Sequence, residues 1–280
     1  MYNVIKSHKL TIILFLLVNF SWMSYGQEIN YGSNHGKYIS LFNTNIYYEE
    51  YGSGTPLLLL HGGFGSIHDF QNVISEFAKH FKVIAVDSPG HGRSEQADSL
   101  SFDLMADYFS KMIDLLKLDN VNIIGYSDGG ITALLLAEKR PDKVKKIIAS
   151  GANSSMNGIK SEMLETLKLV NPAFIETYQK EWLEDYKSKS PEKDKWEKFI
   201  TDIIKMYSKE EIISDQILSG IHAKVLLIYG DRDVIKLEHG IKLFQKIIGS
   251  SLCVLPNTSH EVFNDCPELI SKIGIEFLTK

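Results

Sequence analysis

Short apolar runs alternate with longer periodic segments along most of the chain. The short runs are nearly continuous in apolar residues, which is typical of strands buried on both faces of a sheet. A turn at Asn43-Thr44-Asn45 predicts that the first two strands form an antiparallel hairpin. We expect strands at Tyr38–Phe42, Ile46–Tyr51, Leu57–Leu60, Val83–Val86, Val121–Gly125, Val144–Ala149, Val225–Tyr229 and Leu252–Leu255.

The segments between these runs carry apolar residues at helical spacing. They predict helices at Asp69–His80, Phe102–Leu116, Gly130–Lys139, His239–Ile248 and Pro267–Leu278. Strands that alternate with helices in this way are typical of an α/β fold. We therefore expect an open, mostly parallel sheet with helices on both faces.

One segment interrupts the alternation. Residues 154–219 contain no strand pattern but have Trp182, Trp196 and many charged residues at helical spacing. We interpret them as a helical insertion in a core formed by residues 27–153 and 220–280. The charged residues predict a solvated face, while the aromatic residues either face a pocket or pack the insertion together.

The N-terminal residues differ from the rest of the chain. Lys6 and Lys9 precede an apolar run that ends at Phe20, and small or polar residues follow up to Gly26. This pattern predicts a secretory signal peptide over residues 1–26, and the run is short for a membrane-spanning helix. We expect an exported protein, periplasmic or secreted, with no stable membrane anchor after cleavage.

Composition narrows the classes of function. The chain of 280 residues has a net charge of −5, which argues against a nucleic-acid-binding protein and favours a small-molecule substrate. Cys253 and Cys266 are the only cysteines. They are too few for a disulfide framework, and we favour Cys253 as a small hydrophobic residue in a strand over a bridge between the two.

The segment Gly125-Tyr126-Ser127-Asp128-Gly129 follows a predicted strand and opens a predicted helix. A G-x-S-x-G turn in this context holds a serine in a strained conformation, and glycines are needed where the neighbouring chain leaves no room for a Cβ. The serine oxygen then lies at a helix N-terminus, where negative charge is favoured. We therefore predict that Ser127 is a nucleophile.

A serine nucleophile needs a base and an acid that orients the base. In the strand-turn-helix version of this triad the chain order is serine, acid, histidine. His260 follows the last predicted strand, and Asp231 and Asp233 follow the strand before it. We predict that His260 is the base and Asp233 the acid, with Asp231 as the alternative.

The negative oxygen that forms in such a reaction needs two N–H donors. We expect one from the backbone of Asp128, the residue after the nucleophile. The glycine-rich loop that begins at His61 should supply the other, from Gly63 or alternatively Phe64. We expect His61 itself to be structural, and Phe64 and Tyr126 to contact the substrate.

Together these segments resemble the α/β-hydrolase fold family, from Tyr38 to the C-terminus. The resemblance rests on the Leu57–Gly63 segment, Asp87-Ser88-Pro89-Gly90-His91-Gly92-Arg93-Ser94, the serine turn, Gly230-Asp231-Arg232-Asp233 and the late His260. It implies an eight-stranded sheet, a triad of Ser127, Asp233 and His260, and a helical cap over residues 154–219.

Within the family, the segment from Tyr126 to Leu134 is similar to the valacyclovir-hydrolase-like branch. That resemblance implies cleavage of α-amino acid esters, with Asp128 holding the substrate ammonium. The alternative role of Asp128 is to stabilise the helix N-terminus.

The sequence therefore predicts a serine hydrolase that cleaves a small ester through an acyl-serine intermediate. We expect no metal or cofactor, because neither metal-ligand spacing nor a phosphate-binding G-x-x-x-x-G-K-[ST] motif is present. Two alternatives remain open. One is an amide-cleaving aminopeptidase of the same fold, and the other is a protein that binds a small molecule with negligible turnover.

Overall fold

The computed structural model describes residues 36–280, which contain one sheet of eight strands. The predicted signal peptide, residues 1–26, lies outside the described residues. The strand order is β1-β2-β4-β3-β5-β6-β7-β8; β2 pairs antiparallel with β1 and β4, and the remaining pairs are parallel. The strands are β1 (Lys37–Leu41), β2 (Thr44–Tyr51), β3 (Pro56–Leu60), β4 (Lys82–Val86), β5 (Val121–Tyr126), β6 (Val144–Ser150), β7 (Lys224–Gly230) and β8 (Ser251–Leu255).

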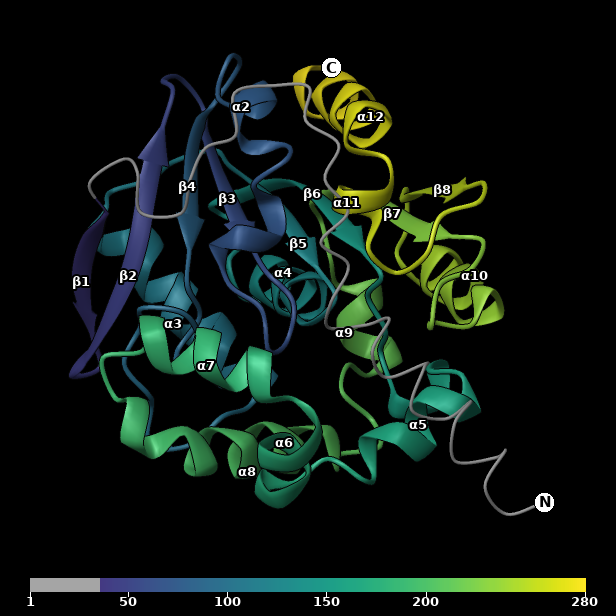
Figure 1. Cartoon of the computed structure of the whole chain (residues 1–280). Helices are drawn as coiled ribbons and strands as arrows, with labels where there is room; N and C mark the ends of the chain where they lie inside the picture. The colour runs from purple at the N-terminus through teal and green to yellow at the C-terminus, as the bar shows by residue number, and fades with distance from the viewer. Residues whose placement is uncertain (1–35) are drawn as a thin grey trace.

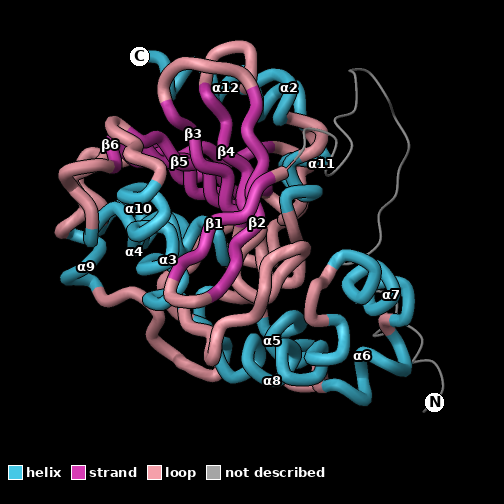
Figure 2. Tube along the Cα trace, turned by 90° about the vertical axis from the view of Figure 1, so that its left-hand side faces the viewer, coloured by secondary structure: helices cyan, strands magenta, loops and turns pink. Residues whose placement is uncertain are grey.

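Helices cover both faces of the sheet, so the predicted fold class is confirmed (Figures 1 and 2). One face packs against α3 (Phe102–Leu115), α4 (Asp128–Lys139) and α10 (Leu237–Lys246), and the other against α2 (Ile74–Phe77), α11 (Val262–Asp265) and α12 (Pro267–Thr279). In β3, Leu58 and Leu60 belong to the first core and Leu57 and Leu59 to the second. Side chains alternate between the faces of a strand, and for this reason a two-sided sheet needs continuous apolar runs.

The helix predicted at Asp69–His80 is wrong in form. The structure has a 3₁₀ turn, η1 (Ile67–Phe70), then a break, and then the single turn of α2. Ile67, Phe70 and Val73 are buried at intervals of three residues. That spacing suits a 3₁₀ period better than an α-helical one, because residues i and i+3 eclipse in a 3₁₀ helix.

Helices fill the chain between β6 and β7. We call residues 151–223 the helical segment. It contains η2 (Met156–Gly158), α5 (Ser161–Leu167), α6 (Pro172–Tyr178), α7 (Lys180–Lys189), η3 (Lys193–Lys195), α8 (Trp196–Tyr207) and α9 (Asp215–Ser219). Its helices α6, α7 and α8 gather at one end of the sheet (Figure 1). Trp196 is buried within the segment with Lys187 over its ring, so this aromatic residue packs the segment.

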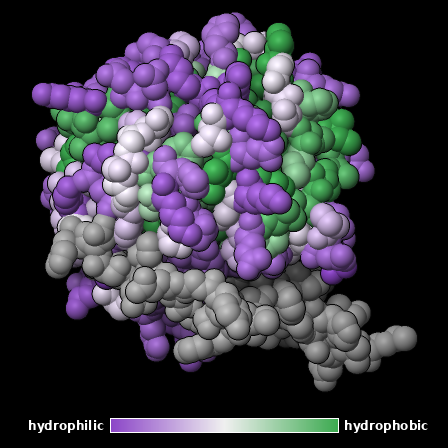
Figure 3. All heavy atoms as spheres, turned by 90° about the horizontal axis from the view of Figure 1, so that it is seen from above, coloured by the Kyte–Doolittle hydropathy of each residue, from purple (hydrophilic) through white to green (hydrophobic). Residues whose placement is uncertain are grey.

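Polar side chains spread over much of the face in Figure 3, and apolar ones gather toward its right-hand edge. No helix within residues 36–280 combines the length and apolar character that crossing a membrane requires. Cys253 and Cys266 are both free thiols of intermediate burial. Cys253 lies in β8 and packs against the second core, as expected for a small hydrophobic residue.

The contact between α4 and β3 gives a test of the packing. A Cβ on Gly129 would lie 1.9 Å from the carbonyl oxygen of Leu60. Neither backbone can yield without disturbing the sheet, so we expect Gly129→Ala to lower the free energy of unfolding by about 3 kcal/mol or more. Urea unfolding of the purified variant measures this loss.

Gly220→Ala is the matched control, because a Cβ there would meet its nearest neighbour at 3.4 Å. It should change the free energy of unfolding by less than about 0.5 kcal/mol. Equal effects of the two substitutions would contradict the packing argument.

Candidate active site

Ser127 lies in the sharp turn between β5 and α4. Its φ of 52° is in the left-handed region that non-glycine residues rarely adopt. A Cβ on Gly125 would lie 2.3 Å from the carbonyl oxygen of Gly129. The turn therefore requires glycine on both sides of the serine, and it presents the serine at the N-terminus of α4.

The structure brings Ser127, His260 and Asp233 together at the carboxyl ends of β5, β8 and β7. The Oγ atom of Ser127 lies 3.0 Å from Nε2 of His260, and Nδ1 of His260 lies 2.7 Å from Oδ1 of Asp233. His260 and Asp233 are buried. This geometry allows a proton to move from the serine hydroxyl to the imidazole while the carboxylate holds the ring.

The two aspartates that follow β7 have different partners. Asp233 contacts His260 and also accepts the N–H of Ile235 at 2.9 Å. Asp231 instead accepts the N–H of Thr258 at 3.2 Å, which ties the loop after β7 to the loop after β8. The geometry therefore selects Asp233 as the residue that orients His260.

The predicted N–H donors border the same space. Within residues 36–280, no group accepts a hydrogen bond from the backbone N–H of Gly63, Phe64 or Asp128. Gly63 and Asp128 line one cavity with Ser127. Unpaired N–H groups beside a nucleophile are available to a developing negative charge.

Buried His61 and half-buried Asp69 support the loop that carries Gly63. Nε2 of His61 accepts the N–H of Ser88 at 2.9 Å, and burial lowers the pKa of His61 to about 3, so this histidine is neutral and structural. The carboxyl group of Asp69 accepts the N–H of Gly62 at 3.2 Å. Burial and the nearby charge of Glu261 raise the pKa of Asp69 to about 7.

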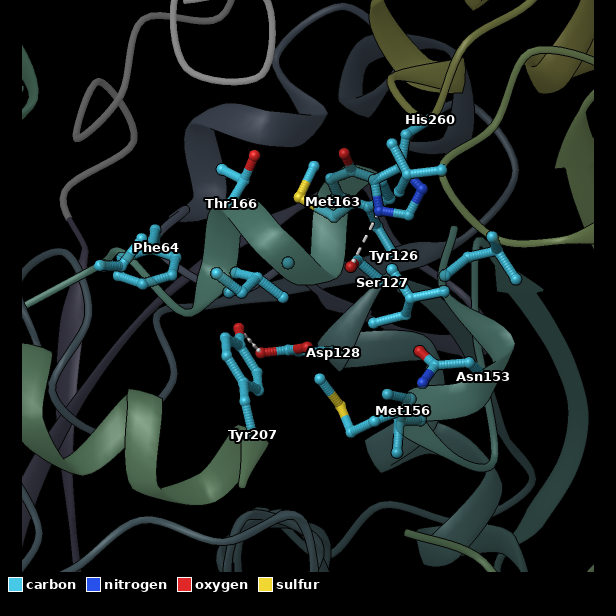
Figure 4. A pocket seen from close by; sticks show the side chains of 18 of the residues that line it. Phe64, Tyr126, Ser127, Asp128, Asn153, Met156, Met163, Thr166, Tyr207 and His260 are labelled. Carbon is cyan, nitrogen blue, oxygen red and sulfur yellow. Dashed lines mark hydrogen bonds between the residues drawn. The ribbon is translucent and has the colours of Figure 1, made fainter. Parts of the chain in front are cut away.

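Asp128 points toward the helical segment. Its Oδ2 accepts the hydroxyl of Tyr207 from α8 at 2.6 Å, and the side chain is directed away from Ser127 (Figure 4). No described residue donates to the other oxygen, Oδ1, so it remains available to the cavity. Burial raises the pKa of Asp128 to about 6, and the carboxyl group is therefore largely ionised at pH 7.

A further carboxyl group, Glu261, directly follows His260. It accepts the hydroxyl of Tyr126 at 2.6 Å and lines the cavity. Burial lowers the pKa of His260, but the charges of Asp233, Glu261 and Asp128 outweigh this effect and leave that pKa above its ordinary value. Three carboxyl groups thus stabilise the protonated imidazole.

Above these groups the cavity is mostly apolar. Trp182 and Tyr207 of the helical segment line it, so some aromatic residues of the segment face a pocket, whereas Trp196 packs the segment together. Its apolar wall comprises Ile131, Met156, Ile159, Met163, Leu167, Val170, Phe174, Ile175, Ile212, Val234 and Ile235. Among residues 36–280, neither a lysine nor an arginine lines it, and no group of three or more His, Cys, Asp or Glu side chains is arranged to bind a metal.

Sequence reasoning missed Tyr207, Glu261 and Asp69 as parts of this site. Glu261 had a local signal, since it is adjacent to His260. Tyr207 had none, because it reaches Asp128 from a helix 79 residues away in the sequence. Asp69 belongs to the segment whose helix was predicted in the wrong form.

Known proteins resemble this chain over most of its length. Human serine hydrolase BPHL is 28% identical over 254 residues, which cover 86% of this chain and 85% of the relative. The 2-hydroxy-6-oxo-6-phenylhexa-2,4-dienoate hydrolase of Burkholderia cepacia is 27% identical over 269 residues, covering 85% and 92%.

A solved structure resembles the fold. It is a meta-cleavage product hydrolase from Pseudomonas fluorescens, with a TM-score of 0.72 at 19% identity over 87% of this chain and 97% of the other. The sequence profile of the alpha/beta hydrolase fold matches residues 55–181, from β3 to α7. With the eight-stranded sheet, these similarities show that the chain has the alpha/beta hydrolase fold and resembles hydrolases of that family.

Proposed function

We propose that this protein is a serine hydrolase that cleaves a small, uncharged or positively charged ester through an acyl-serine intermediate. The observation that carries the proposal is the contact of Ser127 with His260 and of His260 with Asp233, at 3.0 and 2.7 Å, beside an apolar cavity. No described residue competes for the Ser127 hydroxyl, so it is directed to the base.

In the proposed reaction, Ser127 Oγ attacks the ester carbonyl carbon while His260 Nε2 takes the serine proton. The N–H groups of Asp128 and Gly63 stabilise the oxyanion, with Phe64 N–H as the alternative to Gly63. His260 then gives the proton to the departing alcohol, which leaves an acyl-serine. A water that loses a proton to His260 attacks this ester, and the acid is released with a restored serine.

Charge supports an uncharged or positively charged substrate. Asp128 and Glu261 line the cavity and no described lysine or arginine does, so a substrate carboxylate would meet repulsion without a lysine or arginine partner. The relative from Burkholderia cepacia is named for a dienoate, which is a carboxylate. We therefore favour an ester over such a substrate for this chain.

The free Oδ1 of Asp128 supports the narrower proposal of an α-amino acid ester. Tyr207 fixes the carboxyl group through Oδ2, and the remaining oxygen can accept a hydrogen bond from an ammonium group. Asp128 thus combines two proposed roles, with its backbone N–H on the oxyanion and its side chain on the amine. The helical segment would act as the cap that closes the cavity.

Substitutions in the proposed triad should lower kcat to different extents. Ser127→Ala removes the nucleophile, and we expect kcat for ester hydrolysis to fall by about 10⁴-fold or more. Asp233→Asn leaves the serine but changes the hydrogen bond that holds His260, so we expect a fall of about 10³- to 10⁴-fold. Steady-state kinetics on a 4-nitrophenyl ester measures both losses.

Asp231→Asn is the matched control for Asp233→Asn, because Asp231 contacts Thr258 and does not contact His260. It should change kcat by less than about tenfold. Ser188→Ala, an exposed serine of α7, controls for Ser127→Ala. Ser127→Ala with wild-type kcat would remove the serine from the mechanism.

The amine proposal is tested with a matched pair of substrates. We expect kcat/KM for an α-amino acid ester to exceed that for its N-acetylated twin by about tenfold or more, because a hydrogen bond to a charged group contributes about 1.5–3 kcal/mol. Asp128→Asn should abolish the preference. An aryl amide of the same amino acid, measured in parallel, tests the aminopeptidase alternative.

Equal rates on the two esters would leave hydrolysis of uncharged esters as the function. Tight binding without Ser127-dependent turnover of any of these substrates would favour the small-molecule-binding alternative.

Activity should rise with pH through the pKa of His260. The imidazole must be neutral to accept the serine proton, and nearby carboxylates hold its pKa above the ordinary value of 6.5. We expect the acidic limb of the kcat/KM profile to lie above pH 6.5 and to move to lower pH in Glu261→Gln. That variant removes one negative charge but keeps an oxygen that can accept the Tyr126 hydroxyl.

An unshifted limb in Glu261→Gln would contradict the electrostatic role of Glu261. Glu268→Gln, on the exposed start of α12, is the control for a general change in net charge.

A further inference from the structure

Gln179 lies where α6 ends and α7 begins. Its backbone is satisfied: its N–H donates to the carbonyl of Ile175 at 2.9 Å, and its carbonyl accepts the N–H of Leu183 at 3.0 Å. The residue is only 6% exposed, yet it lines the cavity that contains Ser127. A polar side chain is therefore buried on the helical side of the cavity.

The side-chain amide of Gln179 has no hydrogen-bond partner within residues 36–280. A primary amide has two N–H donors and an acceptor oxygen, and neither polar atom of the Gln179 amide is fully enclosed by described residues, so the amide is open to the cavity that Gln179 lines. Other uncharged polar side chains of the cavity are engaged: Asn153 donates to the carbonyl of Ser155 at 2.9 Å, and Thr166 donates to that of Glu162 at 3.0 Å.

The position of Gln179 separates it from the reacting groups. Ser127 and His260 enter the cavity from the ends of strands, whereas Gln179 enters from the helical segment beside Ile175 and Trp182. Trp182 donates its Nε1–H to the carbonyl of Phe64 at 2.9 Å, which holds the start of α7 against the loop after β3. Gln179 thus lines the cavity from the start of an anchored helix.

We propose that Gln179 is a substrate-binding residue that accepts from or donates to an uncharged carbonyl, amide or hydroxyl group of the substrate, away from the bond that is cleaved. This inference rests on the proposed ester hydrolysis. The amide is neutral and its neighbours are apolar, so it matches an uncharged hydrogen-bonding group within an otherwise apolar part of the substrate.

The test compares esters that differ by one carbonyl group. The probes are 4-nitrophenyl hexanoate with its 4-oxo and 5-oxo analogues, and hexyl acetate with its 4-oxo and 5-oxo analogues, so that the carbonyl lies in the acyl or the alcohol part. We expect wild-type kcat/KM to favour at least one oxo ester by about tenfold over its parent, since an unmatched buried amide penalises the parent.

Gln179→Met keeps the length of the side chain but removes its polar atoms. We expect it to abolish the preference through KM, to leave kcat/KM for the parent esters unchanged or higher, and to leave Tm unchanged or higher. Gln216→Met, an exposed glutamine of α9, is the matched control and should keep the preference.

Three results would overturn the inference: no oxo preference in the wild type, a preference that survives Gln179→Met, or a fall of several degrees in Tm, which would mean that the amide has a structural partner. If the protein hydrolyses none of the probes in a Ser127-dependent reaction, the result contradicts the proposed function instead. The Tm of Gln179→Met, compared with that of the wild type, then still tests whether the amide is unpaired.

Discussion

The close approach of two backbones at Gly129 fixes the geometry of the site. A Cβ at this position would lie 1.9 Å from the carbonyl oxygen of Leu60, at the end of β3. This contact seats the start of α4 against the strand whose following loop carries Gly63. The same backbone contact therefore sets the distance between the serine turn, which carries the predicted donor Asp128, and the loop that carries the predicted donor Gly63. The packing around Ser127 maintains its positive φ.

Negative charge is the second organising property. Asp233, Glu261 and Asp128 all stabilise a protonated His260, while Asp69 lies close enough to Glu261 for that charge to raise its pKa. In the proposed reaction, this negative charge would lower the cost of moving a proton from Ser127 to the imidazole. It would also disfavour a carboxylate substrate in the same cavity, so one charge distribution would act on both the proton transfer and the choice of substrate.

The sheet could be predicted from the sequence because its strands are nearly continuous in apolar residues, and each predicted strand lies within two residues of the observed bounds. The pairing of Ser127 with His260 followed from turn chemistry and chain order. Asp233 was predicted as the acid, but Asp231 stayed open as the alternative, because both follow β7 and only the packing of the loop decides which carboxylate contacts the imidazole. The roles of Tyr207 and Gln179 could not be predicted from the sequence for a similar reason, because they depend on where the helical segment packs against the core.

That docking rests on a few directional contacts between the helical segment and the core. Tyr207 holds Asp128 at the start of α4, and Trp182 holds the carbonyl of Phe64 in the loop after β3. One bond ends on Asp128, a predicted oxyanion donor, and the other on Phe64, which follows the predicted donor Gly63. A shift of α7 or α8 would therefore change the cavity and the donors together. In the proposed reaction, substrate contacts made by the helical segment would therefore alter turnover as well as binding, because the helices that would contact substrate also position the groups that would stabilise the reacting oxygen.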